Sequence, residues 1–137
     1  MDKFIIRPTP STPEIHFSFE DNNFSIRGVS RPEDVRALYY PVIEWIKELA
    51  DSIISNKINI YSKENPLKFQ VDLLYFNSSS AKFLYDIFTE LKRLPDAGIS
   101  IIVEWHYEKE DIDMRDAGRD IALLAEMEFT YIEKEEE

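Results

Sequence analysis

Three consecutive hydroxyl side chains, Ser78, Ser79 and Ser80, follow directly after Asn77 in this sequence. Serine and asparagine oxygens accept hydrogen bonds from the unpaired N–H groups of a first helical turn, so the cluster is typical of a helix cap. A hydroxyl at the start of a helix is also a candidate phosphate acceptor, because the positive end of the helix dipole stabilises a phosphoryl group. The four residues therefore predict either plain caps or a phosphorylation site.

A second charged feature is the acidic run over residues 108–113, which contains Glu110, Asp111 and Asp113. On its own such a run indicates a solvated loop. If the strands that precede the serines and the acidic run are parallel, their carboxyl ends share one edge of the sheet and bring the two features close together. A phosphate on a serine would then meet like charge within about 8 Å, or share Mg²⁺ with the carboxylates.

Composition excludes several kinds of chemistry. The chain has 137 residues, a formal net charge of −11 and no cysteine, which excludes disulfides, thiolate metal sites and cysteine nucleophiles. The acidic balance argues against a partner made of nucleic acid or an anionic membrane surface. The three glycines are too far apart for a phosphate-binding loop. His16 and His106 have no second ligand at metal spacing and are expected to be half-exposed strand residues. We therefore expect no enzyme activity, no cofactor and no metal, and a cytoplasmic location.

The elements that must position these residues follow from the apolar pattern. Period-two alternation predicts strands over 14–19, 24–28, 67–75, 99–107 and 129–132. Apolar stripes predict helices over 35–53, 84–91 and 114–125, the first capped by Ser30 with Glu33 and bent or split by Pro41. Residues 1–13 are expected to form an extended, proline-rich arm, and 133–137 an acidic tail.

This order, ββαβαβαβ, predicts a single α/β domain over residues 1–137. Later strands alternate with helices and are expected to be parallel. The early strands carry one apolar face each, so all three main helices are expected on one face of a mixed sheet of about five strands. The predicted architecture is a two-layer domain.

Five segments in order resemble the SiaC-type regulatory phosphoproteins. They are the segments at 11–15, 28–33, 40–46, 74–82 and 103–107, of which Leu-Tyr-Phe-Asn-Ser-Ser-Ser-Ala-Lys at 74–82 is the central motif. The resemblance spans roughly residues 9–132. It implies a fold similar to STAS domains, the anti-sigma-factor antagonists of partner-switching systems. It also implies an acceptor hydroxyl directly after the motif asparagine, which is Ser78 here, with Ser79 and Ser80 as competing hydroxyls.

The resemblance further implies three protein partners. These are a serine/threonine kinase with a histidine-kinase-like ATP-binding fold, a metal-dependent PP2C-type phosphatase, and an output protein such as a diguanylate cyclase, which links the family to cyclic di-GMP and biofilm. Asn77 would shape the turn before the helix, and Lys82 would contact either the phosphate or a partner. Glu110, Asp111 and Asp113 are the further contact candidates.

Two other interpretations stay open at this point. One is a STAS-like module that senses a small ligand or binds proteins without phosphorylation, with the serines as plain caps. The other is a small enzyme that uses the acidic run as a metal site. Lys82 is equally well explained as an exposed helix lysine.

Overall fold

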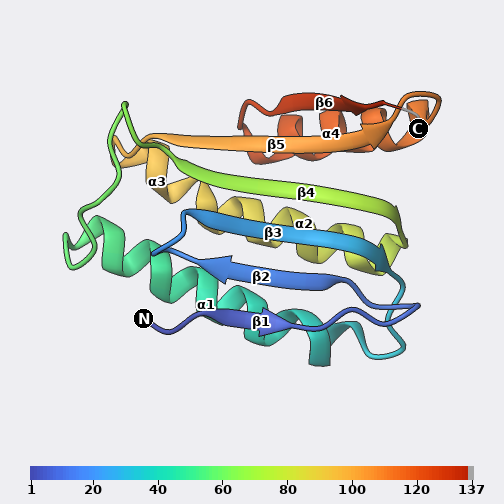
Figure 1. Ribbon diagram of the computed structural model, residues 1–137, viewed down its shortest axis with the longest axis horizontal. Helices are drawn as coiled ribbons and strands as arrows, with labels where there is room; N and C mark the ends of the chain where they lie inside the picture. The colour runs from blue at the N-terminus through green and yellow to red at the C-terminus, as the bar shows by residue number, and fades with distance from the viewer. Residues whose placement is uncertain (136–137) are drawn as a thin grey trace.

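The alternating segments of the sequence form one six-stranded sheet, and the helices lie together on one side of it (Figure 1). The computed structural model describes residues 1–135. Its strands are β1 (Phe4–Ile6), β2 (Glu14–Ser18), β3 (Asn23–Ser30), β4 (Leu67–Phe76), β5 (Ile101–Glu108) and β6 (Thr130–Lys134). Its helices are α1 (Val35–Ile54), α2 (Ser78–Leu91), the short α3 (Arg93–Asp96) and α4 (Ile112–Ala125).

The strands lie in the sheet in their order along the chain. The pairs β1–β2 and β2–β3 are antiparallel, whereas β3–β4, β4–β5 and β5–β6 are parallel. Each parallel pair is joined through a helix on the same face, as right-handed crossovers require. The carboxyl ends of β4 and β5 therefore point to the same end of the sheet, where α2 and α4 begin (Figure 1).

The core fills the space between the sheet and the helices. Inward-facing residues alternate with more exposed ones along β4, as a sheet covered on one face requires. Burying each large apolar side chain contributes roughly 1.5–3 kcal/mol. The largest fully buried side chains include Trp105, Tyr39, Phe17, Phe24, Phe69 and Phe88.

The mixed sheet and the three main helices on one face are confirmed, but the sheet has six strands rather than five. The missed strand, β1, lies within the predicted arm 1–13 and pairs with β2. It is too short to show a period, and it is fixed by contacts far along the chain. The Phe4 ring stacks on Phe17, with centroids 6.0 Å apart, and packs beside Trp45 at 6.2 Å.

Two predicted helix features and the predicted tail also need correction. Asp34, not Ser30, caps α1, because its carboxylate accepts the Ala37 N–H at 3.0 Å. The predicted split of α1 at Pro41 is also wrong, because the helix continues through that residue to Ile54. Residues 133 and 134 of the predicted acidic tail belong to β6, and residues 136–137 lie outside the described residues.

Candidate functional site

The turn from β4 into α2 is organised by Asn77. Its side-chain oxygen accepts the Ser80 N–H at 2.9 Å, and its own N–H donates to the Ser30 carbonyl at 3.0 Å. Asn77 has extended backbone angles, φ −85° and ψ 172°, as a residue that caps a helix requires. The prediction that Asn77 shapes this turn agrees with these bonds, which fix the start of α2 against the end of β3.

The three serines after Asn77 have different environments. Ser78 and Ser79 are exposed, whereas Ser80 is fully buried. The Ser79 hydroxyl donates to the Asn77 side-chain oxygen at 3.1 Å. No hydrogen bond of the Ser78 hydroxyl occurs within residues 1–135. Ser78 is therefore the hydroxyl of the three that is both exposed and uncommitted to a partner in the described chain.

A buried hydroxyl cluster, formed by Ser30, Tyr39 and Ser80, lies beneath this turn. The Ser30 Oγ is 2.6 Å from the Tyr39 hydroxyl and 2.8 Å from the Ser80 Oγ. The Ser80 hydroxyl donates to the Ser30 carbonyl at 3.1 Å. If Tyr39 donates to Ser30 and Ser30 to Ser80, all three hydroxyl protons are used. Burial raises the pKa of Tyr39 above its ordinary value, and the hydrogen bond to Ser30 opposes that rise.

Sequence reasoning missed the buried hydroxyl cluster. Ser30 lies fifty positions from Ser80, and each residue alone is typical of a helix cap. The pairing depends on the parallel register of β3 with β4, which places Ser30 opposite Phe76 and hence beside the start of α2. No short-range pattern in the sequence carries that register.

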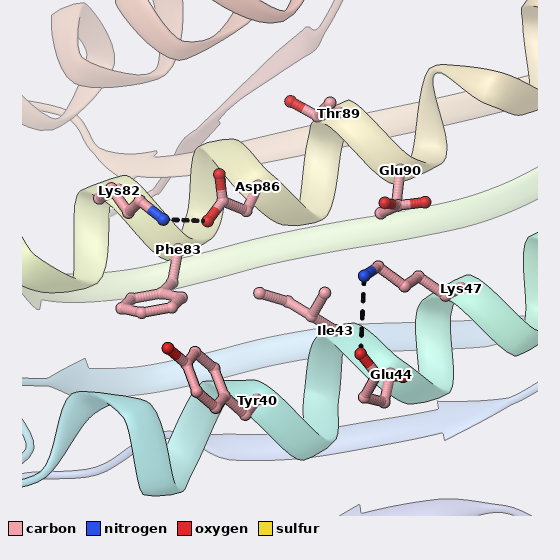
Figure 2. Close-up of a pocket in the computed structure, with 9 residues that line it drawn as sticks. All are labelled: Tyr40, Ile43, Glu44, Lys47, Lys82, Phe83, Asp86, Thr89 and Glu90. Atoms are coloured by element: carbon pink, nitrogen blue, oxygen red, sulfur yellow. Dashed lines mark hydrogen bonds and ion pairs between the residues drawn. The ribbon is translucent and has the colours of Figure 1, made fainter.

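Lys82 lies one turn into α2, in an ion pair with Asp86. The Nζ–Oδ2 distance is 2.7 Å, and the ammonium group also lies 4.8 Å from the centre of the Phe83 ring. Lys82, Phe83 and Asp86 border a pocket of about 380 Å³ between α1 and α2 (Figure 2). Tyr40, Ile43 and Phe83 form its apolar part. The charged residues around it are Glu44, Lys47, Lys82, Asp86 and Glu90.

The acidic candidates lie at the start of α4. The Asp111 carboxylate caps this helix by accepting the Met114 N–H at 3.0 Å, and Asp113 is exposed in its first turn. Glu110 is exposed in the preceding turn. Asp111 therefore has a structural role, whereas the candidates Glu110 and Asp113 face solvent, as does Glu108 in the same run.

The serines and the acidic run lie at the same end of the sheet (Figure 1). Pairing of β4 with β5 ends at Val71 and Trp105, before either strand ends, so the two turns are not hydrogen-bonded to each other through the sheet. Within residues 1–135, no hydrogen bond or ion pair joins Ser78, Ser79 or Ser80 to the acidic run. A groove of about 410 Å³ lies between α2 and α4, and Lys82 and Asp120 border its apolar surface.

The two histidines and Trp105, which were the other residues considered for chemistry, are strand residues. His16 and His106 are half-buried strand residues, as predicted. Trp105 is fully buried and donates its indole N–H to the Met114 carbonyl at 2.9 Å. In the part of the chain that the structure describes, no group of three histidine, aspartate or glutamate side chains is placed to hold a metal ion. Among residues 1–135, none of the helices combines the length with the apolar composition that a membrane span requires.

Comparison with known proteins shows which class of protein this chain represents. A family described as SiaC family regulatory phosphoprotein matches residues 6–134, so the class is that of a regulatory protein. The match covers nearly the whole chain and includes both the β4–α2 turn and the acidic run. The chain belongs to the SiaC family.

Individual relatives agree with this assignment. An uncharacterized protein of Pseudomonas aeruginosa strain UCBPP-PA14 is 31% identical over 112 residues, which cover 81% of this chain and 80% of that protein. The crystal structure of apo-SiaC from Pseudomonas aeruginosa matches with a TM-score of 0.78 at 24% identity, over 98% of this chain and 100% of that one. SiaC in complex with the diguanylate cyclase SiaD, which it activates in that organism, matches with a TM-score of 0.80 at 24% identity, over 96% and 99%.

Proposed function

We propose that this protein is a non-catalytic switch, reversibly phosphorylated on Ser78, whose phosphorylation state controls its binding to an output protein. One observation carries the choice of Ser78. Its hydroxyl is exposed at the first position of α2 and has no partner within residues 1–135. A kinase needs such a hydroxyl, since the oxygen that attacks the phosphoryl donor must enter another protein's active site.

The neighbouring hydroxyls fit this role less well. Ser80 has no exposed surface, and its Oγ is committed to the buried hydroxyl cluster, so its phosphorylation would require α2 to open. The Ser79 hydroxyl is exposed but bonded to the side-chain oxygen of Asn77. Phosphorylation of Ser79 would remove a hydroxyl donor from the oxygen that caps α2.

A phosphate at Ser78 would change the surface around α2 strongly. It adds about −1.5 to −2 charges and three acceptor oxygens. The first turn of α2 presents N–H groups and the positive end of its dipole to that phosphate. The same end of the sheet carries the exposed carboxylates of Glu110 and Asp113. A partner that recognises this end therefore meets a different charge in the two states.

The partners that we propose come from the family. SiaC of Pseudomonas aeruginosa forms a complex with a diguanylate cyclase that it activates, which supports a diguanylate cyclase as the output protein here. We also propose a serine/threonine kinase with a histidine-kinase-like ATP-binding fold and a PP2C-type phosphatase as the opposing enzymes. This protein, the kinase, the phosphatase and the cyclase would then form a partner-switching system, as the STAS-like fold expected from the sequence implies.

Phosphosite mapping tests the proposal directly. The protein is purified from its native cells, under several growth conditions, and analysed by mass spectrometry with complete coverage of residues 68–92. We expect phosphate on Ser78, and none at that position in a Ser78→Ala strain. Ser79→Ala is the matched control, because it changes a neighbouring exposed serine and should retain the modification.

Two results would contradict the proposal. Phosphate on Ser79 or Ser80 with Ser78 unmodified would show that Ser78 is not the phosphate acceptor. No phosphate under any condition would leave the serines as structural residues of the first turn of α2 and favour a ligand-sensing or protein-binding module without phosphorylation.

A further inference from the structure

Ser78, Lys82 and Asp86 follow one another at intervals of four residues along α2. Residues with this spacing are neighbours on one face of a helix. Lys82 thus lies between a hydroxyl on its N-terminal side and a carboxylate on its C-terminal side. In the structure its side chain is directed along the helix toward Asp86 (Figure 2), with the charged atoms 2.7 Å apart.

We propose that Lys82 leaves Asp86 and binds the phosphate when Ser78 is phosphorylated. This inference rests on the proposed modification of Ser78 and describes how its effect extends along α2. Lys82 is free to move, because its side chain is 67% exposed and its contacts are one exposed ion pair and one ring face. Exposed pairs of this kind hold a side chain only weakly.

Three physical arguments favour the phosphate over Asp86 as the partner of Lys82. The phosphate carries close to two negative charges and three acceptor oxygens, against one charge on the carboxylate. An acid four residues before a lysine forms a more favourable helix pair than an acid four residues after it. Long side chains on a helix also lean toward its N-terminus, which is the direction of Ser78.

The move would change surfaces that do not touch Ser78. Lys82 borders both the pocket between α1 and α2 and the groove between α2 and α4. When Lys82 moves to the phosphate, Asp86 loses its ion-pair partner. The Phe83 ring, at the edge of the pocket between α1 and α2, loses its contact with the Lys82 ammonium group. A phosphate at the start of α2 would thus expose a negative charge two turns further along the helix.

The test uses protein made with phosphoserine incorporated at position 78, so that it needs no kinase. A ³¹P NMR pH titration gives the second pKa of the phosphate, which a nearby ammonium group lowers because it stabilises the dianion. We expect Lys82→Gln to raise that pKa by roughly 0.2–0.4 pH unit. The matched control is Asp86→Asn, which removes the competing acid and should leave the phosphate pKa unchanged or lower.

A second readout follows Asp86 itself. The ¹³C signal of its carboxyl group at pH 7 should move on phosphorylation in the parent protein and stay fixed in Lys82→Gln. Equal phosphate pKa values in the parent and Lys82→Gln would overturn the inference. So would a rise in Asp86→Asn as large as that in Lys82→Gln. Because phosphoserine is incorporated when the protein is made, these results are independent of whether native cells modify Ser78.

Discussion

Ser78 and Ser80 carry the same hydroxyl group two residues apart, yet the helix that begins at Ser78 turns one outward and the other inward. The outward hydroxyl is available to another protein. The inward one completes the buried hydroxyl cluster with Ser30 and Tyr39. At this scale the sequence predicted a helix cap within residues 77–80, because a cap depends on neighbouring residues, and the structure assigns that cap to Asn77 rather than to a serine. It did not predict which serine is buried, because that depends on where α2 packs.

Substitution of Ser80 tests the buried cluster. Ser80→Ala removes the group that accepts from Ser30 and donates to the Ser30 carbonyl, so buried polar atoms lose partners. We expect the free energy of unfolding to fall by about 1–3 kcal/mol. Urea denaturation followed by circular dichroism measures it.

Ser78→Ala is the matched control for that substitution. It removes an exposed hydroxyl from the same turn, and we expect a change within about 0.5 kcal/mol. Equal losses in the two variants would show that the buried cluster contributes no stability of its own.

At the scale of the elements, the position of α4 depends on a close contact between Gly118 of this helix and Trp105 of β5. Gly118 packs directly against the ring of Trp105, so that an added Cβ would lie 2.6 Å from the Cδ1 and Nε1 atoms. The ring cannot easily move, because it is fully buried, donates to the Met114 carbonyl and packs against Phe76 and Phe129. The missing side chain at Gly118 therefore allows α4 to lie close to β5.

Gly118→Ala tests this packing, because two effects predict opposite signs. Helix propensity alone predicts a gain of up to about 1 kcal/mol. The clash with Trp105 predicts a loss of about 1–3 kcal/mol, and we expect the loss to prevail. Asp120→Ala, at an exposed position of the same helix, is the control and should change stability little. A variant at position 118 more stable than the parent in thermal unfolding would contradict this account.

The predicted elements differ from the observed ones for an identifiable reason. The strands and helices with a long apolar period were found, since that period reports which face is buried. The strand β1 was missed because three residues show no period, and its pairing with β2 is supported by aromatic contacts of Phe4. Ser30 was assigned to a cap because it precedes a helix, although β3 extends to that residue and Asp34 caps α1.

For the molecule as a whole, the free energy of unfolding at high pH depends on tyrosines whose hydroxyl groups are buried in the folded protein. Burial raises the pKa of Tyr39 and of Tyr61, and the Tyr61 hydroxyl is buried without a hydrogen-bond partner in the described chain. A group whose pKa is higher in the folded state stabilises the fold fully below its unfolded pKa. That stability is lost as the pH rises from the unfolded value through the folded one.

The free energy of unfolding should therefore decline above about pH 10, the ordinary pKa of tyrosine in an unfolded chain. Tyr61→Phe should reduce this decline and should not destabilise the protein at pH 7, since it removes a buried hydroxyl that has no partner. Urea denaturation at pH 7 and at several values above pH 9 measures both effects. An unchanged decline in Tyr61→Phe, or a clear loss at pH 7, would show that this hydroxyl is satisfied or solvated.

The positions of β1 and α2 have a practical consequence for labelling. Met1 precedes the edge strand β1 at the end of the sheet opposite to the turn from β4 into α2 (Figure 1). A fluorophore or purification handle joined to Met1 would stand far from the Ser78 hydroxyl, whereas one joined after β6 would lie at the same end as that hydroxyl. Sensors that report on the state of Ser78 through a bound partner are therefore best built with the reporter at the amino terminus.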